Sequence, residues 1–195
     1  MNLDGAWSGG AGGGIGTHIY RLGLRWNLSG KIDVNRRLEL INGVENIGDL
    51  RRNGLRLDLE YYRGDVFDVT MSGRVYWSKI KYSLNHELNQ NYVTGRVTTH
   101  ISGYVRNNWL LDVSFHYRIH DRDIFEVNQN IGLLDLSLSR FLLRGRGNIQ
   151  LEIHDLLNQN HGIIFTNGAT YIQEARTESL GRYLILKFTY KPRLL

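Results

Sequence analysis

The segment 109-WLLDVSFHYRI-119 alternates strictly between apolar or aromatic side chains and polar side chains. The odd-numbered positions are Trp, Leu, Val, Phe, Tyr and Ile, and the even-numbered positions from 112 onward are Asp, Ser, His and Arg. A helix would spread this pattern around its whole surface, whereas successive side chains of a strand point to opposite faces of a sheet. The segment therefore predicts a β-strand with one apolar and one polar face.

The same alternation recurs along the chain and predicts nine strands and no helix. We place their apolar positions within residues 20–28, 32–40, 55–61, 67–77, 93–105, 109–119, 134–138, 149–153 and 184–190. The expected fold class is all-β, with antiparallel neighbours paired in sequence order. Residues 1–16 are expected to form a Gly-rich N-terminal segment or a short strand, and residues 17–195 the strand region.

Short and long connections alternate between the predicted strands. We expect tight turns at 29–30, 63–65, 107–108 and 144–147, with a two-residue type I′ turn at Asn107-Asn108, and longer polar connections at 42–53, 85–91, 121–128 and 157–178. Short turns on the periplasmic side and long loops outside are typical of an up-and-down transmembrane β-barrel. Most of the predicted strands also reach the ~9–11 residues needed to cross the hydrocarbon layer.

Composition excludes several other classes of protein. The 195 residues contain no cysteine, so a disulfide scaffold, a thiolate metal site and a thiol nucleophile are excluded. No apolar run approaches the ~18 residues of a membrane-spanning helix. The first thirty residues show no signal peptide, and nine is an odd strand count, although single-chain bacterial barrels have an even number. Both observations favour part of a larger barrel of which about nine or ten strands are present.

Three stretches carry a resemblance to a known family. They are 149-IQLEIHDLLNQN-160, 180-LGRYLILKFTY-190 and 26-WNLSGKIDV-34. The first two resemble the closing hairpin of TonB-dependent receptor barrels, most closely the Bacteroidetes-type outer-membrane β-barrel family, in which an Asp-Leu-Leu-Asn motif ends the penultimate strand and Gly-Arg-Tyr opens the last one. The chain differs from the family in continuing through Pro192 to Leu195, and in lacking a plug and TonB-box segment.

The resemblance implies the C-terminal barrel portion of a TonB-dependent receptor in the bacterial outer membrane. Such a segment would wall a channel for energised nutrient uptake, and its partners would be outer-membrane lipid, the remaining strands, a plug domain and a TonB-type energy-coupling protein. A self-contained small barrel with a structural or adhesive role and a soluble ligand-binding β-barrel remain as alternatives. They differ in where the apolar faces point and in whether the terminal strands pair.

Facing and closure are therefore the two decisive expectations. For a membrane barrel, Trp109, Leu111, Val113, Phe115 and Tyr117 should face lipid, and Asp112, Ser114 and His116 the interior. For a segment of a wide barrel, the strand at 17–28 should not be bonded to the strand at 180–190, because barrel diameter grows with strand number.

No catalytic, cofactor or metal site is expected, and the chain is not expected to be an enzyme. The Gly-rich stretch 9–16 lacks the following Lys-Ser/Thr and helix of a phosphate-binding loop, so we interpret it as a loop or a glycine-rich strand. His116 and His120 would lie roughly 13 Å apart on a strand, too far to share a metal ion. Ser114 and His116 share a face, but a spacing of two is what any polar face supplies.

The excess of arginine raises the question of nucleic-acid binding, which we do not expect. The residues Arg25, Arg56, Arg74, Arg96 and Arg118 are spread singly over the polar faces of different strands, without an obvious cluster. In a barrel they would line the lumen and pair with the carboxylates Asp58, Asp68, Asp112 and Glu152.

Overall fold

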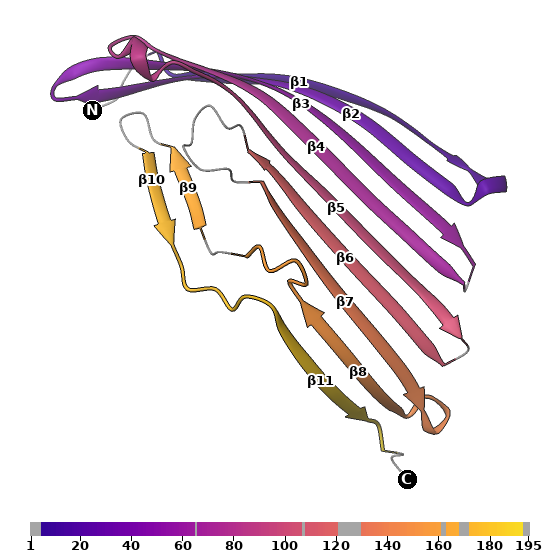
Figure 1. Ribbon diagram of the computed structural model, residues 1–195. Helices are drawn as coiled ribbons and strands as arrows, with labels where there is room; N and C mark the ends of the chain where they lie inside the picture. The colour runs from indigo at the N-terminus through magenta and orange to yellow at the C-terminus, as the bar shows by residue number, and fades with distance from the viewer. Residues whose placement is uncertain are drawn as a thin grey trace.

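One curved antiparallel sheet of nine strands makes up most of the molecule (Figure 1). The computed structural model describes residues 5–64, 66–106, 108–120, 130–160, 163–167 and 172–192. The strands of this sheet are β1 (Trp7–Ile19), β2 (Leu24–Ile41), β3 (Val44–Arg63), β4 (Phe67–Tyr82), β5 (Gln90–Arg106), β6 (Trp109–His120), β7 (Ile131–Leu142), β8 (Gly147–His154) and β11 (Tyr183–Tyr190). Each strand of this sheet pairs with the next strand of the same sheet along the chain, including β8 with β11, so the predicted all-β, up-and-down arrangement is confirmed.

The remaining regular structure is small. Strands β9 (Ile163–Asn167) and β10 (Ile172–Arg176) form a separate two-stranded hairpin within the connection from β8 to β11. Three 3-10 turns of three residues each, η1 (Tyr20–Leu22), η2 (His86–Leu88) and η3 (Leu143–Gly145), lie between strands. Within the described ranges, no helix is long and apolar enough to span a membrane.

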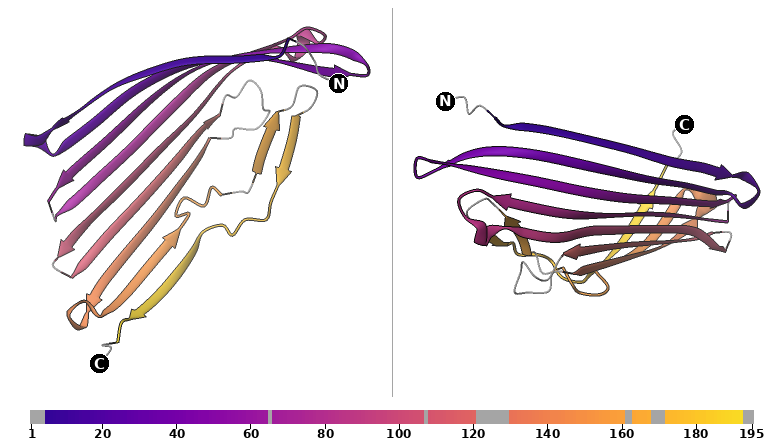
Figure 2. Two further views of the ribbon diagram at one scale, coloured as in Figure 1. Left: turned by 180° about the vertical axis from the view of Figure 1, so that it is seen from behind. Right: turned by 90° about the horizontal axis from the view of Figure 1, so that it is seen from above.

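The sheet is open, because β1 and β11 form its two edges (Figure 2). Among the described residues β1 pairs only with β2, and β11 pairs only with β8. Residues 17–28, expected to be one strand, are the end of β1, the η1 turn and the start of β2. The expectation that residues 17–28 and 180–190 are not bonded to each other is confirmed. The strands β2 to β8 lie between β1 and β11, and each strand is antiparallel to its neighbours in the sheet. Because the number of intervening strands is odd, β1 and β11 run in the same direction. Joining these two edges directly would require a parallel pair.

Two of the predicted connections are wrong. Ser29 and Gly30 lie inside β2 and pair with Gly14 and Gly13, so the two short strands expected at 20–28 and 32–40 are largely one long strand. Residues 42–53, expected to be a loop, are a two-residue turn at Asn42-Gly43 followed by the first part of β3. Both errors arose where the sequence lacks an alternating apolar face although the backbone ladder continues.

The Gly-rich stretch is strand β1, as one of its two interpretations predicted. A Cβ atom built on Gly16 would lie 2.7 Å from the carbonyl oxygen of Trp26, and one on Gly10 would lie 2.9 Å from that of Ile32. At Gly9 and Gly13, which point to the other face, a Cβ would meet nothing within 4 Å. Glycine is thus required on one face of β1, where the β2 backbone approaches closely.

The sheet has two chemically different faces and no core. The cross-strand register places the apolar positions of all nine strands on one face, so that Leu57 lies beside Leu28, and Val113 beside Ile101 and Leu136. None of the described apolar side chains is buried, and Leu186 and Phe188 are 70% and 66% exposed. An uncovered apolar face of this size is unstable in water and needs an apolar surrounding.

The connections at the two ends of the sheet differ in length. At one end, the turn end, residues 20–23, 64–66, 107–108 and 143–146 join consecutive strands, and β11 finishes there. At the other, the loop end, residues 42–43, 83–89, 121–130 and 155–182 join them. Asn107 lies outside the described residues, so the type I′ turn stays a prediction, and the connection expected at 121–128 also lies outside them.

The Asp-Leu-Leu-Asn motif at 155–158 fixes the start of the longest connection. Asp155 is 5% exposed, its N–H donates to the Asp135 carboxylate (2.8 Å), and its own carboxylate accepts from the N–H groups of Gln159 and Asn160. The side-chain oxygen of Asn158 accepts from the N–H of Arg182 (3.0 Å). A Cβ on Gly181 would lie 2.8 Å from that oxygen. The motif therefore ties the end of β8 to β7 and to the start of β11.

Candidate functional site: the polar face of the sheet

The polar face consists of cross-strand rows, each formed by directly opposed residues. Most rows combine complementary groups. Nearest the turn end, Ser102 donates to the Asp112 carboxylate across β5 and β6 (2.7 Å). In the next row, Arg25 pairs with Glu60 across β2 and β3, with 3.6 Å between the guanidinium nitrogen and the carboxylate oxygen. Such opposed pairs are the units that stabilise a sheet.

Ser114 and His116, whose spacing of two places them on one face, each contact a residue of β5. Ser114 lies opposite His100 on β5, with 3.0 Å between its hydroxyl oxygen and Nδ1, while His116 lies 3.4 Å from the Thr98 hydroxyl. The His100 ring is also 3.9 Å from the Asp112 carboxylate. The sequence could not indicate His100, because the contact is made across strands.

These contacts form a polar row across β5 and β6. The strands are paired on both sides at His100 and Ser114, so their backbone N–H groups are not free to form an oxyanion hole. The side chain of His120 lies outside the described set, so its role with His116 stays untested. Among the residues whose placement is described, no group of three or more potential metal-ligating side chains comes together.

One row of the polar face is different, because it contains only one kind of charge. Arg56 lies directly opposite Arg74, Arg74 opposite Arg96, and Arg96 opposite Arg118. Four arginines on four adjacent strands thus form one line across the polar face, which we call the arginine row. The expectation that these arginines are spread singly without a cluster is wrong. Their alignment depends on strand register, which the spacing along the chain does not reveal.

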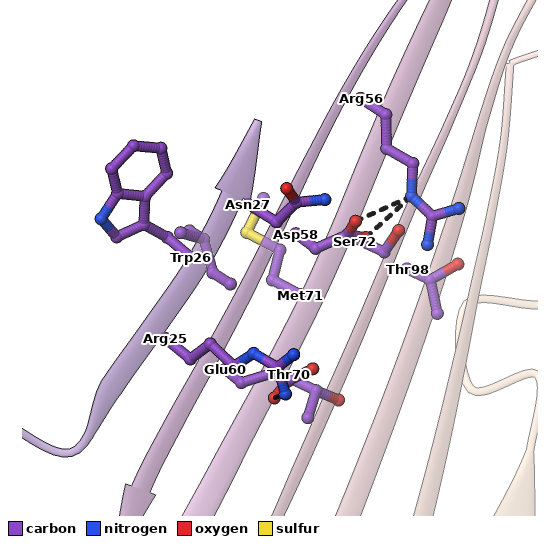
Figure 3. Close-up of a pocket in the computed structure, with 11 residues that line it drawn as sticks. Arg25, Trp26, Asn27, Arg56, Asp58, Glu60, Thr70, Met71, Ser72 and Thr98 are labelled. Atoms are coloured by element: carbon purple, nitrogen blue, oxygen red, sulfur yellow. Dashed lines mark hydrogen bonds and ion pairs between the residues drawn. The ribbon is translucent and has the colours of Figure 1, made fainter. Parts of the chain in front are cut away.

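The predicted pairing of these arginines with carboxylates is formed at one position. The Arg56 Nε donates to both carboxylate oxygens of Asp58, at 2.8 and 3.0 Å, as the dashed lines in Figure 3 show. Asp112 contacts Ser102 and His100 instead, and Glu152 pairs with Lys187 of β11 at 2.8 Å. Within the described part of the chain, Arg74, Arg96 and Arg118 form no ion pair.

A match to a protein family identifies the environment of the two faces. Residues 27–190 match the outer membrane protein beta-barrel family. The chain belongs to this family. Comparison with curated proteins and with solved structures gave no match.

Family membership places the apolar face against lipid and the chain in the bacterial outer membrane. The predicted facing of Trp109, Leu111, Val113, Phe115 and Tyr117 toward lipid agrees with their position on the uncovered apolar face. The soluble ligand-binding barrel, whose apolar stripes would be enclosed, is excluded. On β4 and β6 the apolar stripes run from Phe67 to Trp77 and from Trp109 to Ile119, which matches the ~9–11 residues of a membrane-spanning strand.

Strands β2 and β3 are much longer than this apolar band. They have 18 and 20 residues, and at ~3.4 Å per residue the β3 backbone extends about 65 Å, against an apolar band about 25 Å tall. Their hairpin therefore rises beyond the membrane at the loop end, where both faces contact water. This exposure explains why residues 42–53 are strand without an alternating apolar pattern.

Directly beyond the apolar band, the lipid-side face carries charged side chains in place of apolar ones. Its outward positions there include the cations Arg36, Arg51, Lys79 and Lys81 and the carboxylate Asp49. The Arg36 guanidinium binds Asp49 through two contacts of 2.7 and 3.0 Å. This hydrogen-bonded guanidinium holds the pKa of the Asp49 carboxyl below its usual range, with a further contribution from Lys81.

The Asp49–Arg36 pair predicts a small loss of stability in acid. A carboxyl whose pKa is depressed on folding stabilises the fold above its unfolded pKa of about 3.9, and this contribution is lost as the pH falls through the folded pKa. Because both side chains are about 40% exposed, we expect less than about 1 kcal/mol. Urea unfolding should show Asp49→Asn to be less stable than wild type at pH 6, and this difference in stability should shrink as the pH is lowered to 2. An equal difference at both pH values would contradict this.

Proposed function

We propose that the chain is the C-terminal wall of a larger outer-membrane barrel of the TonB-dependent receptor type, which takes up a nutrient using energy from the inner membrane. The main support is the open sheet, whose edges β1 and β11 run in the same direction. Bacterial single-chain barrels have an even number of antiparallel strands, and an unpaired edge in lipid leaves backbone groups unsatisfied. Additional strands between the two edges would remove both difficulties.

The receptor assignment is supported by the sequence likeness of the closing hairpin. In the structure, the Asp155–Asn158 motif and the Gly181-Arg182 pair contact each other and hold the long loop-end connection. The C-terminus of β11 lies at the turn end, on the side of the short connections, as it would on a periplasmic face. We propose no catalytic role, and the partners would be lipid, further barrel strands, a plug domain and a TonB-type coupling protein.

The alternative of a self-contained small barrel makes a different prediction about the edges. Since this chain has no cysteine, it adds no background of its own to disulfide trapping. In the complete protein in its native membrane, Gly13→Cys with Leu186→Cys should remain unlinked after treatment with a membrane-permeant oxidant. Gly13→Cys with Gly30→Cys is the matched control and should crosslink, because Gly13 and Gly30 are directly opposed on β1 and β2. Efficient crosslinking of the first pair would favour the small barrel.

Energised uptake is tested separately. A strain lacking the complete gene should lose uptake of the nutrient it carries, and the same loss should follow deletion of the TonB-type coupling protein or dissipation of the proton gradient. Uptake that requires the gene but persists without the coupling protein would contradict the receptor assignment and leave a passive channel.

A further inference from the structure

We infer that the arginine row is a binding site for an extended multivalent anion that carries phosphate or carboxylate groups. The row consists of Arg56, Arg74, Arg96 and Arg118, directly opposed on β3, β4, β5 and β6. Like charges directly opposed on neighbouring strands destabilise a sheet, so a row of four cations needs a reason. An anion lying along the row would remove the repulsion and gain hydrogen bonds from several guanidinium groups.

The surrounding rows show that this arrangement is specific to one level of the face. Toward the turn end, the opposed pairs are Ser102 with Asp112, His100 with Ser114, and Thr98 with His116. Counting described residues, Arg56 alone in the arginine row has a carboxylate within reach, that of Asp58 on its own strand. Among the described side chains, the other three guanidinium groups carry no compensating charge.

The space beside the row is open to a ligand. A hollow of about 340 Å³ is lined by Arg96, Arg118, Thr98 and His116, together with the apolar Ile131 and Leu133. A second hollow of about 310 Å³ lies at the other end of the row, where Arg56 and Thr98 contribute to the lining (Figure 3). Arg56, Arg96 and Arg118 are exposed, and Arg74 is partly exposed. Polar hydroxyl and imidazole groups beside the guanidinium groups can supply further hydrogen bonds.

The geometry of the sheet sets the shape of the ligand. Neighbouring strands lie ~4.8 Å apart, so the four arginines extend over about 14 Å with a positive charge at every strand. A ligand with two or more anionic groups at a similar spacing would contact several of them at once, whereas a single phosphate could use only one or two. The row also lies near the loop end of the apolar band, because Arg74 and Arg118 immediately precede Val75 and Ile119. A solute arriving from outside would therefore meet it early.

This inference requires the polar face to be wetted and does not require energised uptake. It is tested with the complete protein purified in detergent at low salt, using inorganic tripolyphosphate and propane-1,2,3-tricarboxylate as probes in calorimetric titration. We expect at least one of them to bind, and to bind at least about tenfold tighter than inorganic monophosphate. The double variant Arg96→Gln/Arg118→Gln should weaken that binding by about tenfold or more. The probe that binds more tightly identifies the anionic group preferred.

Two single variants control for charge and position. Lys79→Gln removes the same type of charge from the opposite face, and Lys187→Gln removes an ion-paired cation from another row of the polar face, outside both hollows. Both should bind the probe within about twofold of wild type. Without anion, the double variant should also unfold at a temperature at or above that of wild type, because like-charge repulsion has been removed. Absence of binding to wild type, equal binding of monophosphate, or equal loss in the controls would overturn the inference.

Discussion

Val113→Arg is expected to prevent stable insertion of the sheet or to cost about 2–4 kcal/mol of folding free energy in a bilayer. Val113 lies at the middle of the apolar stripe of β6, between Ile101 on β5 and Leu136 on β7. A guanidinium group there would lie near the bilayer midplane, where hydration is lost and both directly opposed residues are apolar. Urea titration of the complete protein folded into phospholipid vesicles measures the change.

The neighbouring variant Ser114→Arg is the matched control, because it places the same side chain one residue further along β6 on the polar face. It removes the hydrogen bond to His100 and should cost only about 1 kcal/mol. A large loss of folding free energy for Ser114→Arg and a small loss for Val113→Arg would mean that the Ser114 face contacts lipid and the Val113 face contacts water. Equal losses would contradict the two-faced assignment.

Gly23→Ala is expected to cost about 2–4 kcal/mol, because two separate penalties coincide at this turn. Gly23 has φ +61°, a left-handed conformation that costs an L-residue roughly 1–2 kcal/mol. A Cβ atom there would also clash with the carbonyl oxygen of Tyr62, whose N–H donates to the Gly23 carbonyl at 2.8 Å. The turn joins β1 to β2 and contacts the end of β3, so relief of the clash must displace all three strands.

Gly43→Ala separates the two penalties. Gly43 has φ +81°, but a Cβ there meets nothing within 4 Å, so only the conformational term of about 1 kcal/mol applies. Urea unfolding of both variants in phospholipid vesicles should therefore show that Gly23→Ala has a clearly lower free energy of unfolding than Gly43→Ala. Similar stabilities would show that the β1–β2 turn yields easily and that the clash is relieved without displacing β3.

The sequence predicted strands best where lipid contacts one face and water the other. Residues 67–77 and 109–119 alternate for this reason, and both were placed correctly. Prediction failed at residues 42–53, where the β2–β3 hairpin extends beyond the apolar band and water contacts both faces. Prediction also failed at Gly30, because glycine has no side chain that would mark this strand position as apolar or polar.

The arginine row was not predictable, for a physical reason. Arg56 and Arg74 become opposed only because the turn at residues 64–66 fixes the register of β3 against β4, and each later pair depends on the next turn. A shift of one residue in any hairpin would move an arginine to the other face. The sequence shows which residues are polar, whereas the alignment of four strands comes from the accumulated registers.

The consecutive strand order also determines how the wall can be assembled. Every ladder of the nine-stranded sheet joins neighbours in the chain, and the longest segment enclosed between paired strands is residues 155–182, part of which the β9–β10 hairpin holds together. Because loop-closure entropy rises only slowly with length, each added hairpin faces nearly the same kinetic barrier. Addition of a strand covers one edge and creates an equivalent one, so a growing sheet offers each newly arriving strand the same kind of template.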